Sequence, residues 1–202
     1  MSQTFLMPAV RIEHELVVNK SRFIAWLAPA ASRAEAMALL EAARAAYPDA
    51  RHHCWAYVLG NPTNAASAAA NDDGEPSGTA GKPILNVIQH KGIGNIMVVV
   101  IRYFGGIKLG AGGLVRAYSA VTQEGVEQLP LFEQRPLVSV DISLDYRHEP
   151  QLRRWMEDRK ARLESSEYGT GITLRYRLES TEVAALEDLV AGWQGGQVTM
   201  LS

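Results

Sequence analysis

This chain of 202 residues contains a single cysteine, Cys54, so an internal disulfide bond is excluded. One cysteine also excludes a zinc site built from several cysteines. No apolar run approaches the roughly 20 residues that a membrane-spanning helix needs. Residues 1–10 lack the basic start and the long apolar stretch of a secretory signal peptide. Because 47% of the residues are hydrophobic, which is ordinary for a packed core, we expect a globular cytoplasmic protein without a membrane partner.

Acidic residues are absent between Glu75 and Glu124, although the whole chain carries a formal net charge of −2. The nearly neutral total argues against a protein that coats nucleic acid. Residues 1–135 carry 12 basic and 11 acidic side chains, whereas residues 136–202 carry 8 and 11. We therefore expect a local positive surface on the first part of the chain. The cations of the acid-free interval are Lys82, Lys91, Arg102, Lys108 and Arg116.

The apolar pattern predicts an N-terminal domain in residues 1–130 that contains both strands and helices. Ser32 and Glu35 have the spacing of a capping box, which begins a helix that ends before Pro48. The polar stretch from residue 61 to residue 81 is too long for a plain connection. The other expected elements are strands at residues 10–18, 22–27, 53–59 and 95–103, and helices at residues 79–90 and from 114 onward.

A second domain is predicted in residues 136–202, after a break in the pattern around two prolines. A strand at residues 137–146 is followed by a helix that has Pro150 in its first turn. A hairpin around residues 169–171, a second helix and a last strand at residues 197–201 complete the domain. The order βαββαβ is that of a ferredoxin-like fold, so the fold class is predicted to be α+β.

The densest motif runs from Arg102 to Arg116 and holds five glycines between residues 105 and 113. Glycine exposes backbone N–H groups and tolerates positive φ, so a loop of this kind can wrap around an anion. The helix that follows adds unpaired N–H groups and the positive end of its dipole. We predict an anion-binding site formed by Arg102, Gly105, Gly106, Lys108, Gly110, Gly112, Gly113 and Arg116, with Lys82 as a further contact.

A second motif occupies residues 71–82 and combines acidic with hydroxyl side chains: Asp72, Asp73, Glu75, Ser77 and Thr79. Its carboxylates suit Mg²⁺, which prefers carboxylate oxygens and shared phosphates. Alternatively, they pair with the cations of the glycine-rich run, or the motif only builds turns. The motif is not a Walker phosphate loop, because Pro83 stands where that motif needs a hydroxyl.

His52, His53 and Cys54 are adjacent, but neighbouring residues of a strand point to opposite faces and cannot converge on one ion. A small buried cysteine is the preferred interpretation of Cys54, ahead of a nucleophile. We predict no catalytic residue and no resident metal or cofactor, with Mg²⁺ left as the one open alternative.

The two motifs, together with the segments at residues 54–57 and 21–25, resemble the signature of the IMPACT/YigZ family. The resemblance covers residues from about 20 to 120, and the run from Asp72 to Gly81 is its most specific part. It implies an N-terminal domain like domain 2 of ribosomal protein S5 and a C-terminal domain similar to one in elongation factor G. Both of these domain resemblances imply a function that involves ribosomes or RNA. The eukaryotic relatives of the family regulate translation.

Two functions are compatible with these observations. The first is a non-enzymatic binding protein that contacts RNA, the ribosome or a translation factor through the basic glycine-rich run. The second is an enzyme acting on a small phosphorylated molecule, with Lys108 on the phosphate and Asp72, Asp73 or Glu75 holding Mg²⁺ or acting as base. We prefer the first, because no pairing of a nucleophile with a base is evident. No feature indicates sequence-specific binding to DNA, and the oligomeric state stays open.

Overall fold

The computed structural model describes residues 4–193 and 195–201 and divides the chain into two compact units. The N-terminal unit comprises Thr4–Gln134, and the C-terminal unit begins at Arg135. The two units share no sheet, and each buries hydrophobic residues of its own.

The N-terminal unit is built on a five-stranded sheet in the order β2-β3-β6-β4-β5, in which every neighbouring pair is antiparallel. The predicted strands are confirmed within a few residues, and the central strand β6 is buried along most of its length. The strands are β2 (Ile12–Val18), β3 (Ser21–Pro29), β4 (His52–Leu59), β5 (Ser67–Asn71) and β6 (Ile96–Tyr103).

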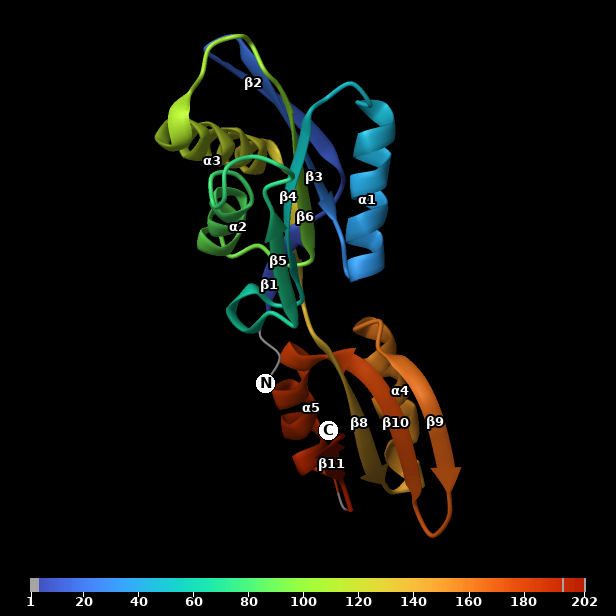
Figure 1. The fold of residues 1–202 in the computed structure, drawn as a ribbon. Helices are drawn as coiled ribbons and strands as arrows, with labels where there is room; N and C mark the ends of the chain where they lie inside the picture. The colour runs from blue at the N-terminus through green and yellow to red at the C-terminus, as the bar shows by residue number, and fades with distance from the viewer. Residues whose placement is uncertain (1–3, 194, 202) are drawn as a thin grey trace. The chain divides into compact units, whose positions relative to one another are not determined.

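Helices cover both faces of this sheet, with α1 (Arg33–Ala46) on one face and α2 (Gly81–His90) and α3 (Gly110–Gln128) on the other (Figure 1). Side chains of β3 alternate between the two cores: Phe23 and Leu27 face α2 and α3, whereas Ile24 and Trp26 face α1. Because both sides are covered, β3 and β6 are apolar at nearly every position rather than at every second one.

The first helix begins as its sequence predicts. The Ser32 hydroxyl accepts a hydrogen bond from the Glu35 amide at 3.2 Å, and the Glu35 carboxylate accepts one from the Ala31 amide at 2.9 Å. The helix ends at Ala46, two residues before Pro48. The Ser32 bond is the N-cap half of the predicted capping box, whereas the Glu35 carboxylate binds the amide of Ala31, one residue before the N-cap, instead of the Ser32 amide.

Three local features differ from the sequence prediction. The polar stretch after residue 60 contains the edge strand β5, whose alanines carry no alternating pattern to reveal it. The short strand β1 (Phe5–Pro8), where no element was predicted, pairs with β7 (Leu131–Gln134), where only a break was expected. The glycine-rich run is a loop only up to residue 109, since Gly110, Gly112 and Gly113 already belong to α3.

The C-terminal unit follows the predicted order βαββαβ, and its antiparallel sheet has the strand order β11-β8-β10-β9. The described core lies between this sheet and the two helices, and includes Ile142, Leu152, Leu174 and Leu186. The elements are β8 (Leu137–Leu144), α4 (Glu149–Asp158), β9 (Arg162–Tyr168), β10 (Ile172–Glu179), α5 (Val183–Ala191) and β11 (Gln197–Met200).

The predicted α+β class is confirmed, with an α/β unit of the ribosomal protein S5 domain 2 type followed by a ferredoxin-like unit. Of the helices formed by residues 4–193 and 195–201, none is both long enough and apolar enough to span a membrane.

Candidate functional site

The acidic loop, residues 72–80, connects β5 to α2 and uses Asp72 to hold the start of that helix. One Asp72 carboxylate oxygen accepts hydrogen bonds from the amides of Ala80 and Gly81 at 3.0 and 2.8 Å. The other accepts one from the Gly78 amide at 2.7 Å. Partial burial alone would raise the pKa of Asp72, but these three hydrogen bonds outweigh it and hold the pKa below its usual value.

Asp73 is directed toward β4 and α1 instead. Its carboxylate accepts a hydrogen bond from the His53 amide at 2.7 Å and lies 3.4 Å from a guanidinium nitrogen of Arg44. The Asp73 carbonyl oxygen lies 2.8 Å from Nδ1 of His52. Asp73 therefore fastens the acidic loop to the first residues of β4.

Glu75 is the carboxylate that pairs with the glycine-rich run. Its Oε1 accepts hydrogen bonds from Nη1 of Arg102 at 2.6 Å and from the Tyr118 hydroxyl at 2.9 Å. The Cys54 thiol lies 2.9 Å from the Asp72 carbonyl oxygen and 3.3 Å from the Tyr118 hydroxyl. Burial raises the pKa of both the Cys54 thiol and the Tyr118 hydroxyl, so neither ionises near neutral pH.

A cleft of about 360 Å³ opens beside this buried pair, and we call it the α3 cleft. Three cationic side chains line it against the one carboxylate of Glu75. Arg102 is buried, whereas Lys108 and Arg51 are exposed. The lining residues are Arg51, His52, Glu75, Pro76, Arg102, Phe104, Lys108, Leu109, Gly110, Ala111 and Leu114.

The first turn of α3 forms one side of the α3 cleft. Leu109 occupies the capping position without a side-chain hydrogen bond to the helix, and the first turn holds no acidic residue. The N–H groups of this turn therefore have no capping side chain, and they carry the positive end of the dipole of a 19-residue helix. An anion would meet amides and cations from several segments at once.

The structure divides the residues predicted to form the anion site. Arg102, Lys108 and Gly110 line the α3 cleft. Arg116 is exposed and lines a separate concavity along α3 with Glu124 and Glu127. Lys82 is exposed in the first turn of α2 and does not line the cleft.

The remaining predicted glycines, Gly105, Gly106, Gly112 and Gly113, do not line the α3 cleft. Gly105 packs so closely on the turn between β2 and β3 that a Cβ would overlap the Lys20 carbonyl group. Gly106 and Gly110 have positive φ angles of 85° and 70°. Gly113 faces Leu109, and Gly112 has only ordinary contact distance to Arg116.

The two hydroxyl residues of the acidic loop differ in exposure and in hydrogen bonding. Thr79 is buried and donates a hydrogen bond to the Pro76 carbonyl at 2.7 Å, whereas Ser77 is exposed. All three carboxylates have partners within the protein, and these partners lie in different directions. Among the residues that the structure describes, no group of three or more His, Cys, Asp and Glu side chains is placed to hold a metal ion.

Arg51, His52 and Phe104 line the α3 cleft although none was predicted to do so. Arg51 and His52 reach it because β4 pairs with β6 in a register that sets His52 opposite Arg102. Phe104 directly follows Arg102 and Tyr103 in the sequence, and an aromatic residue at the start of a basic loop was the available signal.

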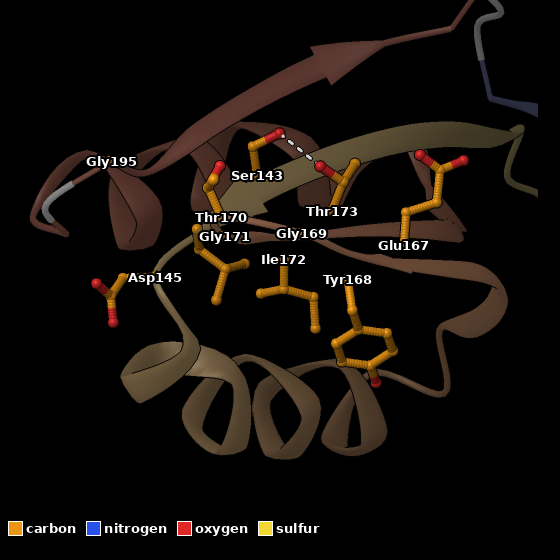
Figure 2. A pocket seen from close by; sticks show the side chains of 11 residues that line it. Ser143, Asp145, Glu167, Tyr168, Gly169, Thr170, Gly171, Ile172, Thr173 and Gly195 are labelled. Atoms are coloured by element: carbon orange, nitrogen blue, oxygen red, sulfur yellow. Dashed lines mark hydrogen bonds between the residues drawn. The ribbon is translucent and has the colours of Figure 1, made fainter.

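A larger cavity of about 660 Å³ lies in the C-terminal unit, around the turn between β9 and β10 (Figure 2). Its polar residues include Asp145 and Glu167, and the hydroxyls of Ser143 and Thr173 lie 3.1 Å apart. None of the described residues that line it is Arg, Lys or His. The α3 cleft, which joins cations to a helix start, is therefore the better candidate for binding an anion.

Comparison with known families gives matches in both units. A family described as the Impact N-terminal domain matches residues 19–126, and a domain of unknown function, DUF1949, matches residues 142–197. The first match contains the whole acidic loop and most of α3, and so includes the α3 cleft.

Individual relatives match over nearly the full length. IMPACT family member YigZ of Escherichia coli (strain K12) is 36% identical over 200 residues, 99% of this chain and 98% of the relative. IMPACT family member YvyE of Bacillus subtilis (strain 168) is 35% identical over 185 residues, 92% and 84% of the two chains. A crystal structure titled as that of a hypothetical protein is 34% identical with a TM-score of 0.73, covering 100% of this chain and 99% of its own.

Proposed function

The chain belongs to the IMPACT family, which is linked to the regulation of translation, and from that premise we propose a non-enzymatic role in binding RNA. The protein contacts RNA, free or within the ribosome, through the α3 cleft and the basic loop at its edge. It acts by occupying a site on the RNA rather than by transforming a substrate.

One observation carries this proposal: the α3 cleft combines three cationic side chains with an uncapped helix start, and Glu75 is the one carboxylate among its lining residues. Within residues 4–193 and 195–201, Lys108 and Arg51 make no ion pair. Asp72 and Asp73 do not line the cleft, and Glu75 already accepts two hydrogen bonds. The positive charge of the cleft is thus available to phosphate groups.

The alternative, an enzyme acting on a small phosphorylated molecule, receives less support. It needs Asp72, Asp73 or Glu75 to hold Mg²⁺ or to take a proton. Each of these carboxylates instead accepts hydrogen bonds from backbone amides or from buried side chains. These hydrogen bonds occupy the carboxylate oxygens that the alternative needs for Mg²⁺ or for a proton.

The test is RNA binding measured as a function of salt. Fluorescence anisotropy with a labelled single-stranded RNA, and co-sedimentation with purified ribosomes, should both give binding at low salt that weakens as salt rises. Each phosphate contact contributes about 0.7 to 0.9 to the slope of log affinity against log salt concentration. Lys108→Glu should weaken binding and reduce that slope.

Arg33→Glu is the matched control, since Arg33 is exposed on α1, which covers the opposite face of the sheet. It reverses one charge, as Lys108→Glu does, but should leave binding unchanged. Absence of binding to both RNA and ribosomes at low salt would overturn the proposal. Binding to ribosomes without binding to isolated RNA would shift it to a protein partner in the ribosome.

A further inference from the structure

Arg102 lines the α3 cleft with one edge of its guanidinium unused. Its Nη1 is held by Glu75, but its Nε is buried without a hydrogen-bond partner. Among the residues that the structure describes, Nη2 has no hydrogen bond either. Buried N–H groups are nearly always paired, so this edge marks a position where an acceptor belongs.

Two other arginines of this chain indicate what kind of acceptor fits that edge. Arg22 holds both carboxylate oxygens of Glu15 with Nε and Nη2, each at 2.9 Å. Arg175 holds Asp141 with the same two nitrogens, each at 2.8 Å. The Nε and Nη2 edge therefore suits a group with two oxygens on one centre, such as a carboxylate or a phosphate.

The surroundings of Arg102 favour phosphate over carboxylate. The N–H groups at the start of α3, the exposed ammonium of Lys108 and the guanidinium of Arg51 border the same cleft. Together these groups provide more hydrogen-bond donors and more positive charge than a single carboxylate can pair with. A phosphate monoester has three terminal oxygens and up to two negative charges.

The depth of Arg102 favours a phosphate at the end of a molecule. Its side chain is only 8% exposed, so a group that reaches it has to enter the cleft. A phosphate inside a nucleic-acid strand is linked to nucleotides on both sides. The strand would therefore have to run into the α3 cleft and out again to bring that phosphate to Arg102. A terminal phosphate has one substituent, which can point out of the cleft.

That substituent meets Phe104, a residue that is 53% exposed and whose ring centroid lies 5.7 Å from the central carbon of the Arg102 guanidinium. An exposed aromatic ring beside a phosphate site provides a face on which a nucleobase can stack. We propose that the α3 cleft binds the terminal phosphate of a nucleotide, with Arg102 and the start of α3 on the phosphate and Phe104 against the base. This rests on the proposed function, because it specifies which part of an RNA the cleft receives.

The experiment compares RNA ends. Four probes are used: a short single-stranded RNA with a 5′-phosphate, the same RNA with a 3′-phosphate, the same RNA with hydroxyls at both ends, and adenosine monophosphate. At least one phosphorylated RNA should bind about tenfold more tightly than the unphosphorylated one, the effect of one charge-assisted contact. Adenosine monophosphate should compete with that RNA if the site reads the terminal nucleotide alone.

Ala111→Asp is the variant that tests whether the terminal phosphate binds in the α3 cleft. Ala111 is the second residue of α3 and lines the cleft, and an acidic residue in a first turn favours the helix, so the fold should be retained. The new carboxylate should abolish the preference for phosphorylated ends. The matched control is Ala34→Asp, at the second position of α1, which should leave the preference intact.

Phe104→Ala should weaken binding of the phosphorylated RNA by about tenfold, as expected for the loss of one stacked base. An equal loss for adenosine monophosphate and for the RNA would place the stacked base at the terminal nucleotide, as proposed. Unchanged affinity for every probe would overturn the role of Phe104.

The other outcomes separate this inference from the proposed function. Equal, salt-dependent binding of phosphorylated and unphosphorylated RNA would overturn the terminal-phosphate site and leave RNA binding standing. Binding of adenosine monophosphate without binding of any RNA would support the phosphate site, assign it to a free nucleotide and contradict the proposed function. No binding of any probe at low salt would overturn both.

Discussion

Arg102 on β6 and Glu75 in the acidic loop are 27 positions apart in the sequence and form an ion pair of 2.6 Å. Their side chains are 8% and 4% exposed, and Tyr118 of α3 donates a hydrogen bond to the same oxygen of Glu75. The pair therefore connects the sheet, the acidic loop and α3 at the base of the α3 cleft. Arg102 therefore holds the acidic loop to the sheet, and the proposed phosphate site would give its unpaired edge a second role.

Removal of Arg102 alone should be strongly destabilising. Arg102→Met leaves the Glu75 carboxylate buried without its cation, a change that costs about 3–5 kcal/mol of unfolding free energy in comparable pairs. Urea denaturation followed by circular dichroism measures this loss.

The double variant Arg102→Met with Glu75→Gln is the control for the ion pair. The substituted glutamine keeps an oxygen for the Tyr118 hydroxyl but carries no charge, so the double variant should be more stable than Arg102→Met alone. A double variant that is less stable than either single variant would mean that the charges are not coupled.

Asp72→Asn should destabilise the protein by about 1–3 kcal/mol at neutral pH, because an amide nitrogen then faces one of the backbone N–H donors. The pKa of Asp72 is lowered in the folded protein, so its stabilisation is complete above the unfolded value of about 4 and is lost as pH falls through the lower folded value. The difference in stability between wild type and variant should therefore be constant from neutral pH down to about pH 4 and shrink below it. Unfolding measured at several pH values tests this, and a difference that grows as pH falls would contradict it.

Cys54 should resist alkylation in the native protein, since its thiol is fully buried and burial raises its pKa. Mass spectrometry after iodoacetamide treatment should show no label under native conditions and one label in denaturant. Ser77→Cys supplies an exposed thiol in the same loop and should take up one label natively. Equal native labelling of both cysteines would show that the region around Cys54 opens readily.

Two glycines of the same run should respond in opposite directions to substitution by alanine. At Gly105 the new Cβ would overlap the Lys20 backbone, so Gly105→Ala should cost about 1–3 kcal/mol or more through overpacking. At Gly112, inside α3, the nearest atom would be Arg116 Nη1 at 3.6 Å, so Gly112→Ala should stabilise by about 0.5–1 kcal/mol. Thermal unfolding of the two variants side by side checks both signs, and a stabilised Gly105→Ala would refute the close packing.

Much of the fold can be predicted from local patterns. The Ser32 N-cap of α1, the apolar run of β6 and the βαββαβ order of the C-terminal unit depend on residues near one another in the sequence. β5 could not be predicted, because an edge strand of small residues has little side-chain pattern and is specified by its pairing with β4. The pairing of β1 with β7 joins residues more than a hundred positions apart, and no local sequence pattern predicts it.

The candidate site could be predicted only in part. Lys108 and the helix start behind it follow from the sequence, since glycines, cations and the apolar stripe of α3 are adjacent there. Arg51 and His52 lie far away in the sequence, and the antiparallel register of β4 against β6 brings them to the cleft. Lys82 and Arg116 carry the same charge as Lys108, and the sequence gives no reason to separate them from it. In the structure neither residue lines the α3 cleft, because each lies on a part of its helix that does not border the cleft.

The sequence by itself determined the family, the fold class and the presence of two unusual motifs, because these properties depend on residue types and their spacing. Only the tertiary structure decided how the two motifs share their charges. Hydrogen-bond geometry acts over about 3 Å, and the fold alone sets which carboxylate comes that close to which donor. It directs Asp72 to the start of α2, Asp73 to β4 and Glu75 to Arg102, and it leaves Lys108 exposed at the α3 cleft.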